Sequence, residues 1–188
     1  MVPVRIDQLG PYAQMVQRAR EDREEILRLL NTMPAEERKR MPDVAKSAVT
    51  LVGKMEQISA DLASAERELQ QRPTEEIDKE ISKLESEANP LDTEGSETRV
   101  RRLAQLRRER RAATEAGRRL ESRKGQLETC RLALENVRLD LVRLRTGNSS
   151  VQSVTLIAEK AMALAHDVDI AVAAAREVRD ATRMKTSA

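Results

Sequence analysis

The sequence lacks phenylalanine and tryptophan, and Tyr12 is its one aromatic residue. Its 39% of hydrophobic residues is therefore almost wholly aliphatic, while 35% of all residues are charged. Six glycines and six prolines among 188 residues are also few. β-Sandwiches and α/β enzymes usually depend on aromatic cores and glycine-rich turns, so this composition disfavours both and favours long helices with thin cores.

Only one cysteine, Cys130, is present, which excludes an internal disulfide and a cysteine-based metal cluster and fits a reducing compartment. The first residues, MVPVRIDQLGP, have no basic segment followed by an apolar one, so they do not predict a signal peptide. No stretch approaches the roughly 18 apolar residues of a membrane span. We therefore expect a cytoplasmic protein. The net charge of +2 does not by itself indicate a polyanionic partner.

Hydrophobic periodicity predicts five helical segments separated by turn residues. The segment PAEERKR after the first helix and NPLDTEGS at 89–96 are expected to be turns. Pro73 should either kink or break the second helix, and Thr74 can cap the third. Gly147 and Asn148 should end the longest helix, with Ser149 or Ser150 capping the next. The predicted helices span residues 11–31, 43–71, 75–88, 97–146 and from about 150 to 183.

These lengths and short connections predict an all-α fold, a long-helix antiparallel bundle. A four-helix head is expected from residues 11–65 and 120–184. A projecting two-helix coiled-coil hairpin is expected from residues 66–119, with its tip at 89–96. Residues 1–10 would form an N-terminal extension and residues 185–188 a tail.

The stretch RVRRLAQLRRERR, at 99–111, carries seven arginines and one glutamate. In the expected hairpin it lies beside an acidic arm: residues 66–88 sum to −4, residues 97–119 to +6, and Asp92 and Glu94 add −2. Opposite charges on paired helices set register and orientation, so Arg101, Arg108 and Arg111 are expected to support pairing. The alternative is a nucleic-acid-binding hairpin that uses the basic arm, although no aromatic residue is present there for base stacking. The candidate interaction residues are Arg99, Arg101, Arg102, Arg107, Arg108, Arg110 and Arg111.

The last helix offers a second candidate surface, because two adjacent faces of it are apolar. One face carries Ala161, Ala171 and Ala175, and the other carries Ala158, Ala165 and Val172. Small residues permit close helix approach. These positions fit either a seam for a further helix or the core of the bundle.

No phosphate-binding loop, GxSxG, HExxH or kinase signature occurs in the chain, so we expect no enzyme activity and no cofactor. His166 stands in HDVD beside Asp167 and Asp169, but this spacing does not bring all three side chains to one helix face, which disfavours a metal site. Cys130 lies on the apolar stripe of the long helix and is expected to be a buried small hydrophobe.

Two stretches carry a family resemblance: NTMPAEERKRMPDVAKSAVTLVGKMEQISADL and LETCRLALENVRLDLVRLRTG, the latter followed by an alanine-rich helix that contains HDVDIAVAAAREVRD. They resemble the helical C-terminal region of certain bacterial soluble serine/threonine protein kinases. No catalytic residue carries over, because the kinase motifs are absent. The resemblance implies a non-catalytic accessory module that serves dimerisation, control of a kinase or docking of a partner.

The sequence thus favours a helical interaction or oligomerisation module, an accessory or regulatory region in bacterial kinase signalling. Its partner would be a protein or a second copy bound through helix packing. Nucleic-acid binding by the basic arm remains the competing hypothesis.

Overall fold

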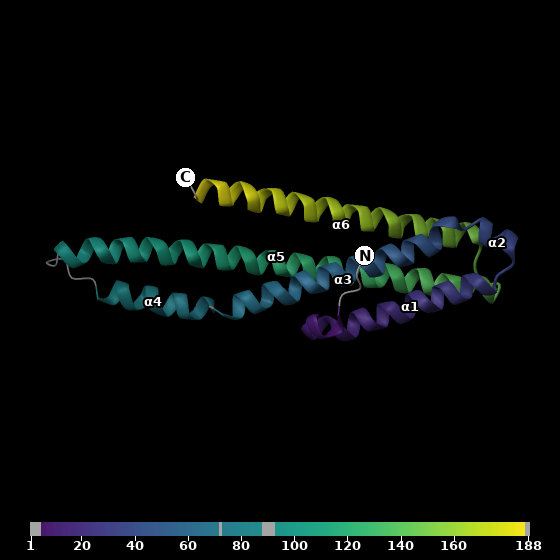
Figure 1. The fold of residues 1–188 in the computed structure, drawn as a ribbon, viewed down its shortest axis with the longest axis horizontal. Helices are drawn as coiled ribbons and strands as arrows, with labels where there is room; N and C mark the ends of the chain where they lie inside the picture. Colours follow the sequence, from purple (N-terminus) through teal and green to yellow (C-terminus); the bar gives the residue numbers. More distant parts are fainter. Residues whose placement is uncertain (1–4, 72, 88–92, 187–188) are drawn as a thin grey trace. The chain divides into compact units, whose positions relative to one another are not determined.

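The computed structural model describes residues 5–71, 73–87 and 93–186, and every element in it is helical (Figure 1). No strand occurs within these residues, which confirms the all-α fold for the described part of the chain. In chain order the elements are the short 3-10 segments η1 (Ile6–Gln8) and η2 (Gly10–Tyr12), and the helices α1 (Ala13–Thr32), α2 (Ala35–Lys39), α3 (Pro42–Gln70), α4 (Thr74–Ser86), α5 (Thr93–Arg145) and α6 (Val151–Thr186).

The chain divides into two compact units. Unit 1 consists of Met1–Ala60 and Gly125–Ala188, and unit 2 of Asp61–Lys124. The α3 and α5 helices therefore contribute residues to both units. The boundaries fall after Ala60 and Lys124, a few residues from the predicted positions at 65 and 119.

In unit 1, segments of α1, α3, α5 and α6 pack around a shared core. Polar pairs at the edges of this core identify the neighbouring helices. They are Arg20–Glu56 between α1 and α3, Arg138–Asp22 between α5 and α1, and Lys54–Asp169 between α3 and α6. A short turn joins α5 to α6, which makes these two helices antiparallel neighbours.

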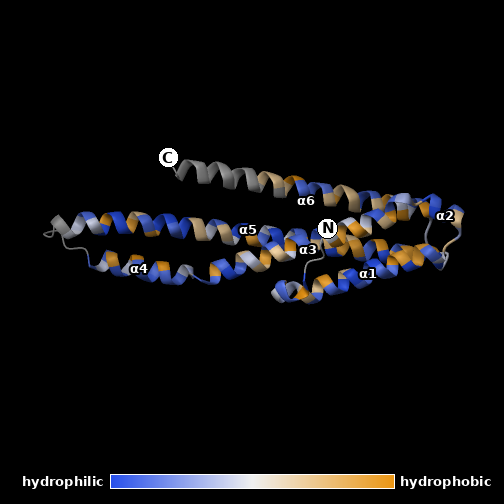
Figure 2. Ribbon diagram, viewed as in Figure 1, coloured by the Kyte–Doolittle hydropathy of each residue, from blue (hydrophilic) through white to orange (hydrophobic). Residues whose placement is uncertain are grey.

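The core of unit 1 is aliphatic, as Figure 2 shows by the hydrophobic colouring along α3 and the second half of α5. Each fully buried leucine or valine contributes about 1.5–3 kcal/mol relative to an exposed one. Leu9 is also fully buried, so the predicted extension 1–10 is wrong at this residue, which belongs to the core. The most deeply buried large side chains of unit 1 are Leu9, Val16, Ile26, Met41, Val44, Leu51, Met55, Leu127, Leu134 and Leu141.

Two local predictions about short connections need correction. The segment predicted as a turn after α1 contains the helix α2, with Glu36 and Glu37 in its first turn and Arg38 and Lys39 in its last. This order of charges suits the helix dipole. The α5 helix begins at Thr93, so residues 93–96 of the predicted tip are helical, while residues 89–92 lie outside the described residues. Arg101 donates to Glu97 one turn earlier, and such a pair supports the beginning of the helix.

Pro73 breaks the helix. The α3 helix ends at Gln70 and α4 begins at Thr74, because proline has no backbone N–H to continue the ladder. The Thr74 side chain does not form the predicted cap. Pro73 itself occupies the N-cap position, with an extended backbone and no side-chain hydrogen bond.

The turn from α5 to α6 follows the predicted chemistry. Gly147 adopts a φ of +77°, and the N–H of Asn148 donates to the carbonyl of Arg143 at 2.8 Å. This is a Schellman ending, for which glycine is favoured because it has no Cβ. Ser150 then caps α6, since its Oγ accepts from the N–H of Ser153 at 3.2 Å. The structure thus selects Ser150 over Ser149.

No helix of the described residues is long and apolar enough to cross a membrane.

Candidate interaction surfaces

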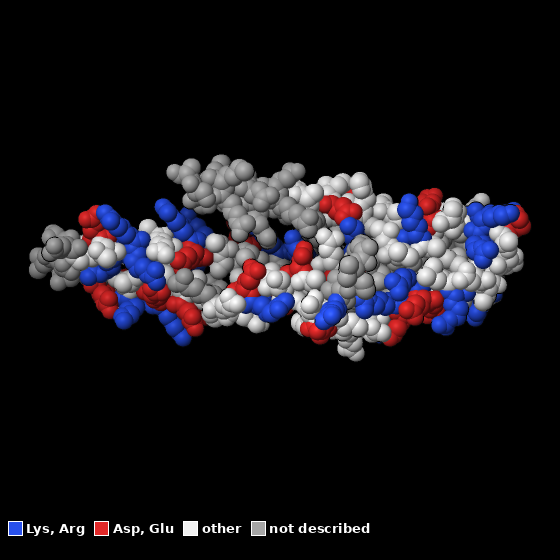
Figure 3. Space-filling view, in the orientation of Figure 1, with Lys and Arg blue, Asp and Glu red and all other residues white. Residues whose placement is uncertain are grey.

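The first candidate surface is the charged pair of helical arms in unit 2. In the acidic arm, Glu80 pairs with Arg102, Glu85 with Arg107 at 2.8 Å and Asp78 with Arg110 at 2.6 Å. At the base of the unit, Asp61 pairs with Arg123 at 2.7 Å and Glu66 with Lys124 at 3.1 Å. Residues 61–66 thus pair with residues 123–124, and residues 78–85 pair with residues 102–110, so the two arms run antiparallel. Figure 3 shows the two charge signs intermixed over this unit.

The arginines of the basic stretch do not all serve this pairing. Arg101 binds Glu97 of its own helix at 2.5 Å. Among the described residues, Arg108, Arg111 and Arg118 are exposed and form no ion pair. The prediction that Arg101, Arg108 and Arg111 support the pairing is therefore wrong. The reason is helical phase: these three project from the face of α5 opposite to buried Leu106.

Arg99 is half-buried and has an interaction partner, so it does not belong to this exposed set.

The second candidate surface, the alanine faces of α6, lies partly in the core. Ala158 and Ala165 are buried together with Val154, Ala161 and Val168. The sequence left open whether Ala158 and Ala165 form a seam or belong to the bundle core, and their burial places them in the core. The buried stripe of α6 takes residues from both faces that the sequence distinguished: Ala161 from one face, and Ala158 and Ala165 from the other. The Val172 side chain lies outside the described residues.

A groove with both apolar and polar walls lies between α5 and α6 in unit 1. Its cavity measures about 540 Å³. Leu132 and Leu139 line it from α5 and are 46% and 36% exposed, while Ile157 and Leu164 line it from α6 and are half-exposed. The remaining lining residues are Thr129, Ala133, Asn136, Asp140, Arg143, Lys160 and Ala161.

Three charged side chains line the groove: Asp140 and Arg143 from α5 and Lys160 from α6. Asp140 is almost buried and accepts a hydrogen bond from Arg143 at 3.1 Å. Glu128 of α5, which does not line the groove, binds Arg131 through hydrogen bonds of 2.7–3.1 Å. These hydrogen bonds lower the pKa of Glu128 and raise that of Arg131. Glu128 and Arg143 remain 48% and 63% exposed, so both are accessible to another molecule.

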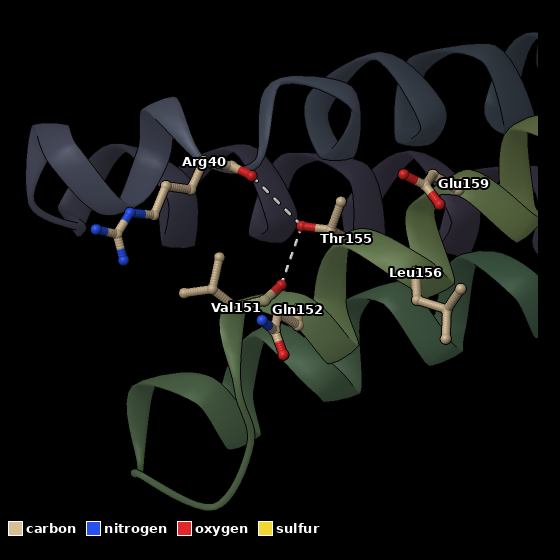
Figure 4. A pocket seen from close by; sticks show the side chains of 6 residues that line it. All are labelled: Arg40, Val151, Gln152, Thr155, Leu156 and Glu159. Atoms are coloured by element: carbon tan, nitrogen blue, oxygen red, sulfur yellow. Dashed lines mark hydrogen bonds between the residues drawn. The ribbon is translucent and has the colours of Figure 1, made fainter.

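A shallower hollow of about 480 Å³ lies at the beginning of α6, beside Arg40 (Figure 4). The Thr155 hydroxyl can donate to either of two backbone carbonyls, that of Val151 at 3.0 Å or that of Arg40 at 3.4 Å. The Arg40 guanidinium extends away from Thr155 in Figure 4. The Thr155 hydroxyl is therefore engaged with backbone carbonyls, which is not the arrangement of a nucleophile activated by a neighbouring base.

Cys130 is fully buried, as predicted. Burial raises the pKa of its thiol to about 11, although nearby Lys54 opposes the shift. At neutral pH the thiol is therefore protonated and a poor nucleophile. His166 is exposed, as expected, and the described residues contain no cluster of three or more histidine, cysteine, aspartate or glutamate side chains that could hold a metal ion.

One partly buried carboxylate joins α1 to α5. Asp22 lies 3.1 Å from the Nε of Arg138, at an angle that makes an ion pair but not a hydrogen bond. The pKa of Asp22 is raised, because desolvation by burial outweighs the attraction of Arg138. Glu25 also pairs with Arg138, at 3.2 Å.

No family model, no curated protein and no solved structure matches this chain.

Leu132 and Leu139 are the functional candidates that sequence reasoning missed. They lie seven residues apart on α5, which is the spacing of one helix face. Their signal was present in the sequence, but it was masked by the stronger stripe of Leu127, Leu134 and Leu141, which forms the core.

Proposed function

We propose that the protein is a non-catalytic helical interaction module that binds a helix of a protein partner in the α5–α6 groove. The observation that carries this proposal is the exposure of Leu132 and Leu139 opposite Ile157 and Leu164 in one cavity. Amphipathic helices bind such grooves through apolar residues spaced at helical intervals. The family resemblance of the sequence supports the further proposal that the module accompanies a bacterial serine/threonine kinase in the cytoplasm.

The groove suits a helix better than a small substrate. Its walls carry leucine and isoleucine, and its polar residues, Thr129, Asn136, Lys160 and the Asp140–Arg143 pair, are distributed along the two helices. Preorganised catalytic sites bring a nucleophile, a base and charge-stabilising groups together. The proposal of a module without enzyme activity follows from this contrast.

A labelled synthetic amphipathic helix tests the proposal. We would titrate a soluble peptide with a leucine stripe at i, i+3 and i+7 against the full chain and measure fluorescence anisotropy. The expected result is saturable binding that Leu132→Glu with Leu139→Glu weakens at least about tenfold, since two charges would then face the apolar helix. No saturable binding, or equal binding by the variant, would contradict the groove as the binding surface.

Val49→Glu provides a control for an added surface charge. Val49 lies on α3, is 51% exposed and does not line the groove, so this substitution adds one glutamate elsewhere, against two in the groove variant. It should leave peptide binding unchanged. Circular dichroism of all variants would establish that unit 1 remains folded.

Nucleic-acid binding is the second candidate, favoured by the exposed Arg108, Arg111 and Arg118 of unit 2. These arginines form no ion pair among the described residues, so they are available for phosphates. A single-stranded and a double-stranded RNA would be titrated at about 50 mM salt and again at about 200 mM. A steep loss of affinity with salt, removed by changing the three arginines to glutamate, would support this function. An absence of binding at the lower salt would exclude it.

A further inference from the structure

We infer that a second copy of this chain covers the exposed face of α5 and α6 around the groove, bound about a two-fold axis that crosses the middle of the groove. This inference rests on the proposed function and names the partner. It follows from the spacing of exposed residues on this face, where apolar residues lie at equal distances from one centre and charges of opposite sign lie at the two ends of α5.

The symmetry is visible along α5. Glu128, Leu132, Asn136, Leu139 and Arg143 follow one another at intervals of one helical turn, on the side of α5 that faces away from the core. Leu132 and Leu139 are equally far from the point between Glu135 and Asn136, and Glu128 and Arg143 are equally far from the same point. The stripe thus has an acidic end, two leucines around an amide, and a basic end.

The α6 wall has a matching centre. Ile157 and Leu164 are equally far from the point between Lys160 and Ala161. Asn148 lies in the turn that joins the two antiparallel helices. The centre of the α5 stripe lies as many residues before Asn148 as the α6 centre lies after it. The two centres therefore lie side by side across the groove, and one axis can serve both helices.

A two-fold axis through this point makes the surface complementary to itself. Rotation places α5 antiparallel to α5 of the second copy and α6 antiparallel to its counterpart, as an isologous interface requires. Leu132 then faces Leu139 of the second copy, and Ile157 faces its Leu164. Glu128 faces Arg143 of the second copy, and the same pair occurs again by symmetry.

The polar residues near the axis define the register. Asn136 lies beside its own copy, where two amides can exchange hydrogen bonds, a device that fixes register in paired helices at some cost in stability. Lys160 also approaches its copy, which opposes association. The covered stretch from Glu128 to Arg143 rises only about 22 Å, so the interface is small beside the roughly 1,200–2,000 Å² of stable complexes. We therefore expect a weak, concentration-dependent dimer.

Sedimentation equilibrium of the full chain tests the inference directly. The average mass should rise from that of a monomer toward that of a dimer between about 1 µM and 1 mM protein. Leu132→Glu with Leu139→Glu should abolish this rise, whereas Val49→Glu should leave it unchanged. A mass that stays at the monomer value over the whole range would overturn the inference.

Charge reversal tests the register. Glu128→Arg alone and Arg143→Glu alone each place like charges opposite each other and should weaken self-association. Mixing the two single variants, or combining both substitutions in one chain, restores opposite charges at both ends and should restore association. If the mixture associates no better than either variant alone, the antiparallel register is wrong.

Lys160→Ala distinguishes self-association from the binding of a different, acidic partner. In the symmetric dimer this change removes a like-charge contact and should strengthen self-association severalfold, whereas with an acidic helix it would remove an attraction and weaken binding. Weaker or unchanged self-association would contradict the two-fold arrangement. If the synthetic peptide binds while the chain remains monomeric, only this inference fails; if neither peptide nor self-association is observed, the proposed function fails with it.

Discussion

Long helices pack together in both unit 1 and unit 2, but different kinds of side chain hold them together in the two units. Unit 1 surrounds an aliphatic core in which leucines, valines and alanines of four helices meet. In unit 2 the described buried residues are Leu62, Ala63, Ile77, Leu106 and Leu120, and charged pairs join the arms at the surface. Apolar burial contributes far more per residue than exposed ion pairs. Unit 1 should therefore carry the stability, while the charges of unit 2 set which helices pair.

The largest effect is expected from a leucine of the unit 1 core. Leu134→Ala removes a side chain that is 1% exposed and should lower the free energy of unfolding by about 2–5 kcal/mol, because it leaves a cavity. Urea titration would measure the loss. Alkylation of buried Cys130 would report it independently, since the thiol becomes reactive only when unit 1 opens.

Leu106→Ala is the matched change in unit 2, because Leu106 is also fully buried on α5. It should increase hydrogen exchange within Asp61–Lys124 and leave the alkylation rate of Cys130 unchanged. If both variants accelerate the alkylation of Cys130 equally, the two units unfold together and do not have separate stabilities.

A smaller effect is expected when the cross-arm charges are reversed. Arg102→Glu, Arg107→Glu and Arg110→Glu together replace three ion pairs by repulsion. Each pair is partly exposed and worth about 0–1 kcal/mol, so the loss should be about 1–3 kcal/mol and confined to unit 2. Hydrogen exchange of the two arms would show it as faster exchange in unit 2 alone.

The control for this charge reversal has the same change in net charge. It reverses Arg108, Arg111 and Arg118, which form no ion pair among the described residues. This control should leave exchange in unit 2 near that of the unchanged chain. Equal acceleration by both triple variants would show that total charge, and not specific pairing, joins the arms.

Next in size is the α5–α6 turn. Ser150→Ala removes the cap of α6 and should cost about 1 kcal/mol. Gly147→Ala forces a side chain into a positive φ and should cost a similar amount. Thermal unfolding would measure both, with Ser149→Ala as the control because Ser150 provides the cap. A larger loss from Ser149→Ala would contradict this assignment.

The smallest predicted effect is a pH dependence from Asp22. The raised pKa of Asp22 means that the folded state binds a proton more readily than the unfolded state. Proton binding by Asp22 therefore stabilises the folded state below the ordinary pKa, and this stabilisation is lost as the pH rises through the pKa of the folded state. Asp22→Asn should therefore gain stability relative to the unchanged chain between about pH 3 and pH 7. The opposite trend would show that the attraction of Arg138 exceeds the cost of burial.

Sequence periodicity predicted the helices well, because apolar spacing and turn residues act locally. Pro73, Gly147 and Ser150 each determine the backbone within a few residues, although the choice between a kink and a break at Pro73 required the structure. The all-α fold followed from the same signals. The beginning of α5 was missed because Gly95 and Ser96 are poor helix formers, and the continuing helix overrides their preference.

The candidate surfaces were harder to predict, because they depend on helical phase. A shift of one residue rotates a helix face by about 100°. The sequence located the basic stretch but could not separate Arg102, Arg107 and Arg110, which pair across the arms, from Arg108 and Arg111, which do not. It likewise left open whether Ala158 and Ala165 form a seam or belong to the core, and it overlooked Leu132 and Leu139. Which of several apolar stripes is covered depends on the neighbouring helices.

The alanines buried along α6 have a consequence beyond packing. Ala158, Ala161 and Ala165 are small, so they allow α6 to lie close to its neighbours, and Ala161 also lines the groove. Ala161, which lines the groove beside residues of α5, therefore helps to set the distance between α5 and α6. Enlarging Ala161 to valine should push α6 outward and change the width of the groove. The width of this proposed binding groove thus depends on a small residue that is itself almost fully buried.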